Sequence, residues 1–177
     1  MKTIRSLTAV AALVFAVNTV QAQAPAPATA SVALSVTQAA VLSISTSQSA
    51  VSVNAVTPGV VTNFPQFNVT TAWNQPSSAG TNVALVGYFA SANALTGSSG
   101  NIPTNRVVGA IGANAAAPFT GTVGSYTNAI QFFTQTLASA PNSSRTDAMT
   151  IGLDYVSGAT PTAGTYTGTL NLVLLVQ

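Results

Sequence analysis

Apolar and polar side chains alternate with a period of two through much of this chain. In residues 83–89 the odd positions hold Val, Leu, Gly and Phe, with Val86 and Tyr88 on the reverse side. In residues 149–155 the odd positions hold Met, Ile, Leu and Tyr. Residues 69–73 place Val, Thr and Trp on one face. Because successive side chains of a strand point to opposite faces, these segments predict β-strands with one face toward a core.

Weaker segments extend the prediction. Short strands are expected at Leu42–Ile44 and Val51–Val53, and another at residues 106–111. Residues 96–101, Thr-Gly-Ser-Ser-Gly-Asn, are typical of a loop. Residues 129–137 carry apolar side chains on both sides, so the pattern leaves a strand and a short helix open.

The first and last alternating segments have no polar residue on one side. Val32, Leu34 and Val36 share one face, opposite Ala33 and Ser35. Near the other end one strand is predicted whose inward residues are Tyr166, Leu170, Leu172, Leu174 and Val176. Val173 and Leu175 make its outer face apolar as well, and such a strand is normally covered on both faces.

Short strands rich in β-branched residues, separated by Gly, Pro, Asn and Ser, favour an all-β fold, an antiparallel β-sandwich. The first residues favour a signal peptide at 1–22, with Lys2 and Arg5 before an apolar stretch and Ala22 before the cut. About 155 residues would remain, enough for one core. Residues 23–30 read as an Ala/Pro-rich extended arm, followed by one domain at 31–177.

Charge is almost absent from this chain. Only 3% of residues are charged, against roughly 25% in an ordinary domain. Without residues 1–22, Arg106 and Arg145 balance Asp147 and Asp154. A neutral surface gives no footprint for nucleic acid, so that class of partner is excluded. It also resists association poorly. That suits a protein that assembles with its own copies, or a secreted protein with an unusual surface composition.

The residue types that carry most catalysis are missing. The sequence contains neither His nor Cys, so the usual general base and thiolate nucleophile are absent. Asp147 and Asp154 are seven positions apart, which places them on opposite faces of a strand. We therefore expect no enzyme activity, no cofactor and no metal site.

Four aromatic residues could stack on a sugar if they were exposed. Trp73 shares its face of the strand with Val69, and Tyr166 shares its face with Leu170, so we expect both aromatic side chains to pack in the core. Tyr88 and Tyr126 are the better exposed candidates.

The segment at residues 162–177, Thr-Ala-Gly-Thr-Tyr-Thr-Gly-Thr-Leu-Asn-Leu-Val-Leu-Leu-Val-Gln, resembles the C-terminal strand of chaperone–usher pilins and spore-coat-protein-U-like domains. The resemblance implies an immunoglobulin-like antiparallel sandwich, a single domain that lacks one strand. A neighbouring subunit would supply the missing strand. The candidate donor residues are Val32, Leu34 and Val36, and the acceptor groove would be bounded by the strand from Leu170 to Val176. The resemblance also implies that the subunit is exported and that a periplasmic chaperone is its partner.

Two functions follow as hypotheses. The first is a non-catalytic, secreted cell-surface structural subunit, pilus-, fimbria- or coat-like, whose partners are its own copies or other surface subunits. It would pass through the periplasm to the cell surface with no membrane span after signal cleavage. The alternative is a monomeric secreted sandwich that binds carbohydrate or protein as an adhesin. In that case Val32 to Val36 would simply be the first strand of a self-contained sandwich.

Overall fold

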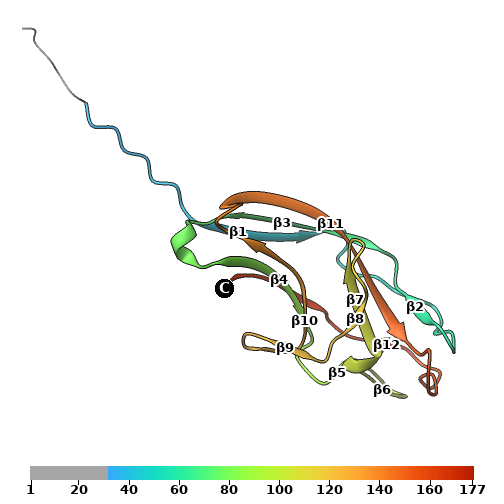
Figure 1. Ribbon diagram of the computed structural model, residues 1–177. Coiled ribbons are helices and arrows are strands. Elements are labelled where there is room, and N and C mark those ends of the chain that lie inside the picture. The colour runs from blue at the N-terminus through green and yellow to red at the C-terminus, as the bar shows by residue number, and fades with distance from the viewer. Residues whose placement is uncertain (1–31) are drawn as a thin grey trace, which may run out of the picture. The chain divides into compact units, whose positions relative to one another are not determined.

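The computed structural model describes residues 32–177. One compact unit extends from Thr37 to Gln177, and it is nearly all β (Figure 1). The predicted signal peptide at 1–22 and the arm at 23–30 lie outside the described residues. In the described part, no helix has the length and apolar character needed to cross a bilayer.

Two antiparallel sheets form the layers of a sandwich, which confirms the predicted fold class (Figure 1). The first, sheet A, has the order β1-β3-β11-β7-β8, and β2 also pairs with β11. Its strands are β1 (Val41–Thr46), β2 (Val61–Asn63), β3 (Phe67–Asn74), β7 (Val107–Ile111), β8 (Ala117–Pro118) and β11 (Asn142–Asp154). The immunoglobulin-like connectivity stays a prediction.

The second layer, sheet B, has the order β13-β4-β10-β9. Its strands are β4 (Asn82–Tyr88), β9 (Gly121–Val123), β10 (Tyr126–Thr136) and β13 (Asn171–Val176). A small sheet C has the order β12-β5-β6. It consists of β5 (Asn93–Gly97), β6 (Gly100–Pro103) and β12 (Tyr166–Thr167). Two single-turn 3₁₀ helices, η1 (Ser77–Ala79) and η2 (Thr104–Arg106), connect strands.

The core lies between sheets A and B. In β3 every second residue is buried, from Phe67 to Trp73, as the alternation predicts. Trp73 is 3% exposed and its Nε1 donates to the carbonyl oxygen of Ala140 at 2.8 Å, so it is a core residue as expected. Residues 83–87 of β4 are buried on both faces, and the two edges of β4 pair with β13 and β10. Leu85 has no exposed surface.

Residues 129–136 form a strand and Leu137 begins the following turn, so the helix alternative is wrong. They belong to β10, which pairs with β4, with a register shift between Gln131 and Phe133. A β-bulge adds one residue to one strand and interrupts its alternation. Phe132 and Phe133 are therefore both buried, which explains the ambiguous pattern.

Three sequence predictions are wrong. Residues 96–101 are not a loop: β5 and β6 form a hairpin whose turn is Ser98-Ser99, closed by Gly100 at a φ of 137°. Val51–Val53 forms no strand, although both valines pack against the core. The final strand is not continuous. It breaks after β12, and β12 pairs with β5 whereas β13 pairs with β4. At Gly168, in the break, a Cβ atom would overlap the carbonyl oxygen of Ala94.

Candidate functional site

The end strands of the two layers lie next to each other on one side of the sandwich. β1 ends sheet A and pairs only with β3, while β13 ends sheet B and pairs only with β4. β1 and β13 also contact each other. Each strand therefore has one edge without a strand partner in the described chain. An unpaired edge presents a row of backbone N–H and C=O groups to which another strand can add.

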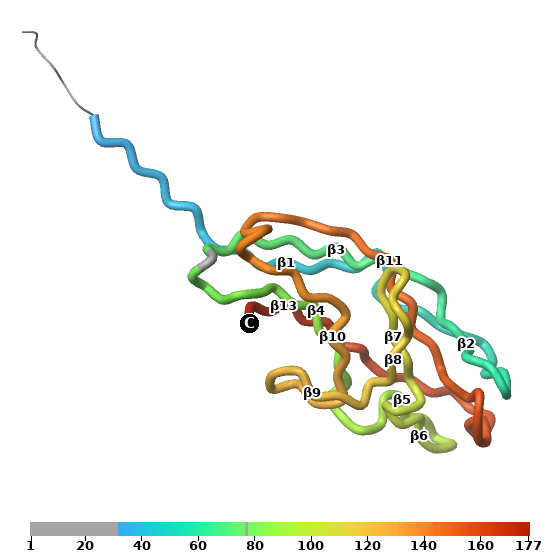
Figure 2. Tube along the Cα trace, viewed as in Figure 1, coloured from blue at the N-terminus to red at the C-terminus, as the bar shows by residue number. Residues whose placement is uncertain are grey.

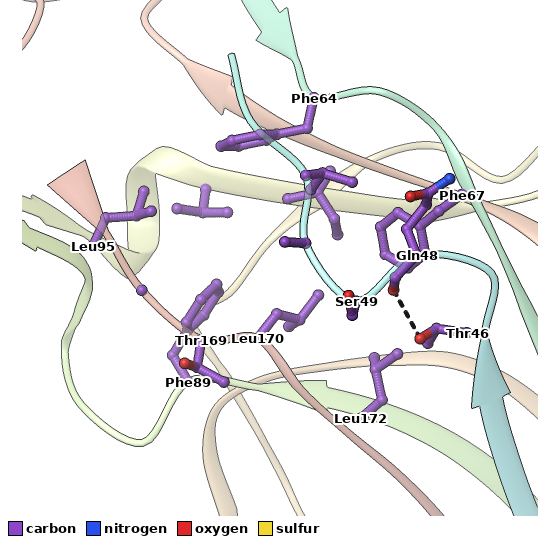
Figure 3. A pocket seen from close by; sticks show the side chains of 15 residues that line it. Thr46, Gln48, Ser49, Phe64, Phe67, Phe89, Leu95, Thr169, Leu170 and Leu172 are labelled. Carbon is purple, nitrogen blue, oxygen red and sulfur yellow. Dashed lines mark hydrogen bonds between the residues drawn. The ribbon is translucent and has the colours of Figure 1, made fainter. Parts of the chain in front are cut away.

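A cavity of about 310 Å³ opens at this side of the sandwich, between residues 46–51 after β1 and residues 168–172 before and in β13 (Figure 3). Its buried lining is apolar and comprises Phe67, Phe89, Val107 and Ile151. Half-buried apolar side chains complete it: Val51, Phe64, Leu95, Leu170 and Leu172. Its exposed lining comprises the polar residues Thr46, Gln48, Ser49 and Thr169, together with Ala50 and Gly168. We call this cavity and the adjoining edge of β13 the groove.

The lining of the groove is suited to holding an apolar segment, and it contains no side chain for acid–base chemistry among the residues described. No ionisable side chain lines it among the residues described. Its polar rim is partly ordered, since Thr46 Oγ1 donates to the carbonyl oxygen of Gln48 at 2.9 Å (Figure 3). An occupant would be held by burial of apolar side chains and by backbone hydrogen bonds, which is how an added strand binds.

The predicted site residues fall in three places. Leu170 and Leu172 line the groove. Leu174 is buried in the core and Val176 packs against it, farther along β13. Tyr166 also packs against the core, but it comes from β12 in sheet C, and its hydroxyl donates to the carbonyl oxygen of Thr162 at 2.8 Å. It does not line the cavity.

The candidate donor residues are fully available. Val32, Leu34 and Val36 are 81%, 91% and 94% exposed, and the segment contains no strand or helix. The alternative in which these residues form the first strand of the sandwich is therefore wrong for this structure, whose first strand is β1.

The ionisable groups have structural surroundings. Arg145 and Asp147 lie within β11, and Arg145 Nη2 donates to Asp147 Oδ1 at 2.7 Å. This hydrogen bond raises the pKa of Arg145 above its usual range. The same guanidinium lies 4.2 Å from the centroid of the Phe133 ring. Asp154 is seven residues farther along the same strand, about 23 Å away, too far for a carboxylate pair.

Arg106 supports the other end of β11. Its guanidinium lies 5.3 Å from the centroid of the Tyr155 ring and donates to the carbonyl oxygen of Ser157 at 2.7 Å. Burial raises the pKa of Tyr155. In the described part of the chain, no three carboxylates, histidines or cysteines gather as metal ligands would.

The sequence indicated only Leu170 and Leu172 for the site, and the aromatic and aliphatic lining residues that it missed include Phe64, Phe67, Phe89 and Leu95. Phe67 and Phe89 continue the alternation of β3 and β4, so their inward direction was visible, though not their common cavity. Phe64 precedes a proline outside any strand, and Leu95 is in the unpredicted β5. No local pattern indicates that these residues meet.

The fold and the groove define the class of this protein as an antiparallel β-sandwich with an open edge. Comparison with protein-family models, curated proteins and solved structures gives no match.

Proposed function

We propose that this chain is a non-catalytic, exported structural subunit of a cell surface, pilus- or coat-like, that assembles by β-strand exchange. The observation that carries the proposal is the groove: an apolar cavity beside an edge strand that has no partner on one side. The same chain carries an exposed alternating segment, residues 32–36, with the pattern that such a groove would accept.

The chemistry of the two parts is complementary. An added strand gains backbone hydrogen bonds along β13, and its alternate side chains enter the cavity. Leu170 and Leu172 line the cavity, together with buried phenylalanines. Val32, Leu34 and Val36 recur every second residue, about 7 Å apart, so they would all point to one side of an extended donor. Neither part is charged, so no Coulomb term opposes their association.

The proposal assigns the donor to a second copy of the chain. Only residues 37–40 separate Val36 from β1. A chain that folded back on itself would need a hairpin turn within this link, and residues 37–40 form no turn in the described chain. Insertion into a neighbour needs no reversal and propagates from one subunit to the next. The resemblance of residues 162–177 to pilin C-terminal strands supports this assignment, and it adds a periplasmic chaperone as the partner before assembly.

The decisive measurement is the mass distribution of the protein beginning at Gln23, by size-exclusion chromatography with light scattering, followed by negative-stain microscopy. A shortened chain beginning at Gln38 lacks the donor residues and is the comparison. The proposal expects long polymers from the longer chain and only monomers, or an unstable protein, from the shorter one. A stable monomer of the longer chain would reject spontaneous self-assembly. If an added chaperone and usher also failed to give filaments, the monomeric binding module would be the better function.

A further inference from the structure

The outer face of sheet B is hollowed. Residues 122–126, at the tip of the β9–β10 hairpin, line one side, and residues 175–177, at the end of the chain, line the other. Figure 2 shows the course of both segments. Gln131 of β10 also lines the hollow, whose volume is about 670 Å³. We call it the outer hollow. It shares no lining residue with the cavity of the groove, although β13 contributes residues to both.

Two irregularities in β10 shape this face. The pairing of β10 with β9 shifts register between Thr127 and Ala129, and Asn128 has a φ of 50°. The pairing with β4 shifts between Gln131 and Phe133. Bulges bend a strand and redirect its side chains, and they are common beside functional sites. An Asn tolerates the left-handed conformation because its short side chain bonds locally.

A pair of tyrosines stands at this face. The rings of Tyr88 on β4 and Tyr126 on β10 have centroids 4.6 Å apart, at an angle of 40°. Both side chains are half-buried, and Tyr126 lines the outer hollow. Neither hydroxyl has a hydrogen-bond partner among the interactions of the described residues. The pair is therefore a supported aromatic surface whose polar atoms are available.

The rest of the lining mixes apolar and uncharged polar groups. Leu175 and Val123 extend the apolar surface, while Thr122 and Ser125 contribute exposed hydroxyls. The carboxamide of Gln131 is exposed, and its Nε2 donates to Thr134 Oγ1 at 2.6 Å, which fixes its orientation. No Arg, Lys, Asp or Glu side chain lines the outer hollow in the described region.

These groups select the chemistry of a ligand. An anionic ligand would lose hydration without gaining a positive counter-charge. A purely apolar ligand would leave the amide and hydroxyl groups of the walls without partners. A neutral saccharide satisfies both kinds of group, because the C–H face of its ring packs on an aromatic side chain and its hydroxyls bond to amides and hydroxyls.

We propose that the outer hollow binds a neutral saccharide, with Tyr126 as the stacking platform, Tyr88 as its support and Gln131 as a hydrogen-bonding partner of the sugar hydroxyls. The saccharide would bind on the outer face of sheet B, whereas the donor strand would add at the edge of β13. A polymer of this chain would therefore display one such site on every subunit.

The test begins with the protein from Gln23 on a printed array of neutral and anionic oligosaccharides. The neutral oligosaccharide with the strongest signal is then titrated by isothermal calorimetry. We expect binding to neutral sugars only, weakened about tenfold or more in Tyr126→Ala and retained in Tyr126→Phe, which keeps the ring.

Gln131→Ala is the second variant. Because residue 131 is exposed, its truncation should leave the fold intact. It should also weaken binding severalfold. Tyr155→Phe is the control. Tyr155 directly follows β11 of sheet A, so this variant should bind the sugar as the unchanged protein does. The proposal would be overturned if the protein bound no neutral sugar or preferred anionic sugars. It would also be overturned if folded Tyr126→Ala and Gln131→Ala bound the sugar with the same affinity as the unchanged protein.

Discussion

Replacing Leu34 by Ser tests strand exchange at a single side chain. Leu34 is 91% exposed in the described chain, so its whole side chain is available for burial in a partner. Burying a Leu contributes about 1.5–3 kcal/mol, and Ser recovers almost none of it. The dissociation constant of the subunit contact should therefore rise about 10- to 150-fold.

The margin for this contact is narrow. Ordering residues 32–36 costs roughly 1–2 kcal/mol for each residue, a total of the same size as the gain from burying three aliphatic side chains. Backbone hydrogen bonds to β13, worth about 0.5–1.5 kcal/mol each, then decide the balance. Because the terms nearly cancel, the loss of Leu34 should be visible as a large drop in polymer.

The assay is sedimentation velocity of the chain from Gln23 over a range of concentrations. The matched control is Ala33→Ser, which introduces the same hydroxyl on the opposite side of the donor segment. Leu34→Ser should need a much higher concentration to polymerise, and Ala33→Ser should behave as the unchanged chain does. If the two variants polymerise at the same concentration, the alternating side chains do not enter a cavity and the reasoning fails.

Three predictions concern the fold. Gly168→Ala should lower the free energy of unfolding by about 1–3 kcal/mol in urea, because its Cβ would overlap the backbone of Ala94; an unchanged midpoint would contradict this packing. Burial raises the pKa of Tyr155 above 10, so the unfolded chain loses that proton first and stability falls as the pH rises beyond 10. Melting temperatures at pH 8 and at pH 11 should show a smaller loss in Tyr155→Phe. Arg145→Met should cost about 1–3 kcal/mol by leaving the Asp147 carboxylate unpaired, and Asp147→Val in the same chain should restore most of it; equal stability of the single and double variants would refute the role of the pair.

The predictable strands are those with regular alternation. In β3, β4 and the apolar part of β11, no bulge interrupts the strand, and one face stays toward the core. The sequence of these segments therefore shows the period of two. β10 could not be assigned, because its bulges insert residues that break the period. The break between β12 and β13 was hidden as well, since Gly168 continues the spacing while the backbone moves to another sheet.

The groove was predictable from one side only. Leu170 and Leu172 were visible as inward residues of the last strand. Phe64 and Leu95 reach the same cavity from segments far away in the sequence, outside any expected strand. Convergence of such segments is decided by the packing of the sheets, which leaves no periodic signal in a single chain.

The position of β13 has a consequence for the order of synthesis. β4 is buried on both faces and needs β13 on one side and β10 on the other. A ribosome delivers β4 early and β13 after every other described strand. Throughout this interval β4 has an apolar, unpaired edge, which is the kind of surface that joins the wrong chain. The nascent protein therefore completes sheet B only after its last strand has emerged, and whatever accompanies it until then must protect that edge.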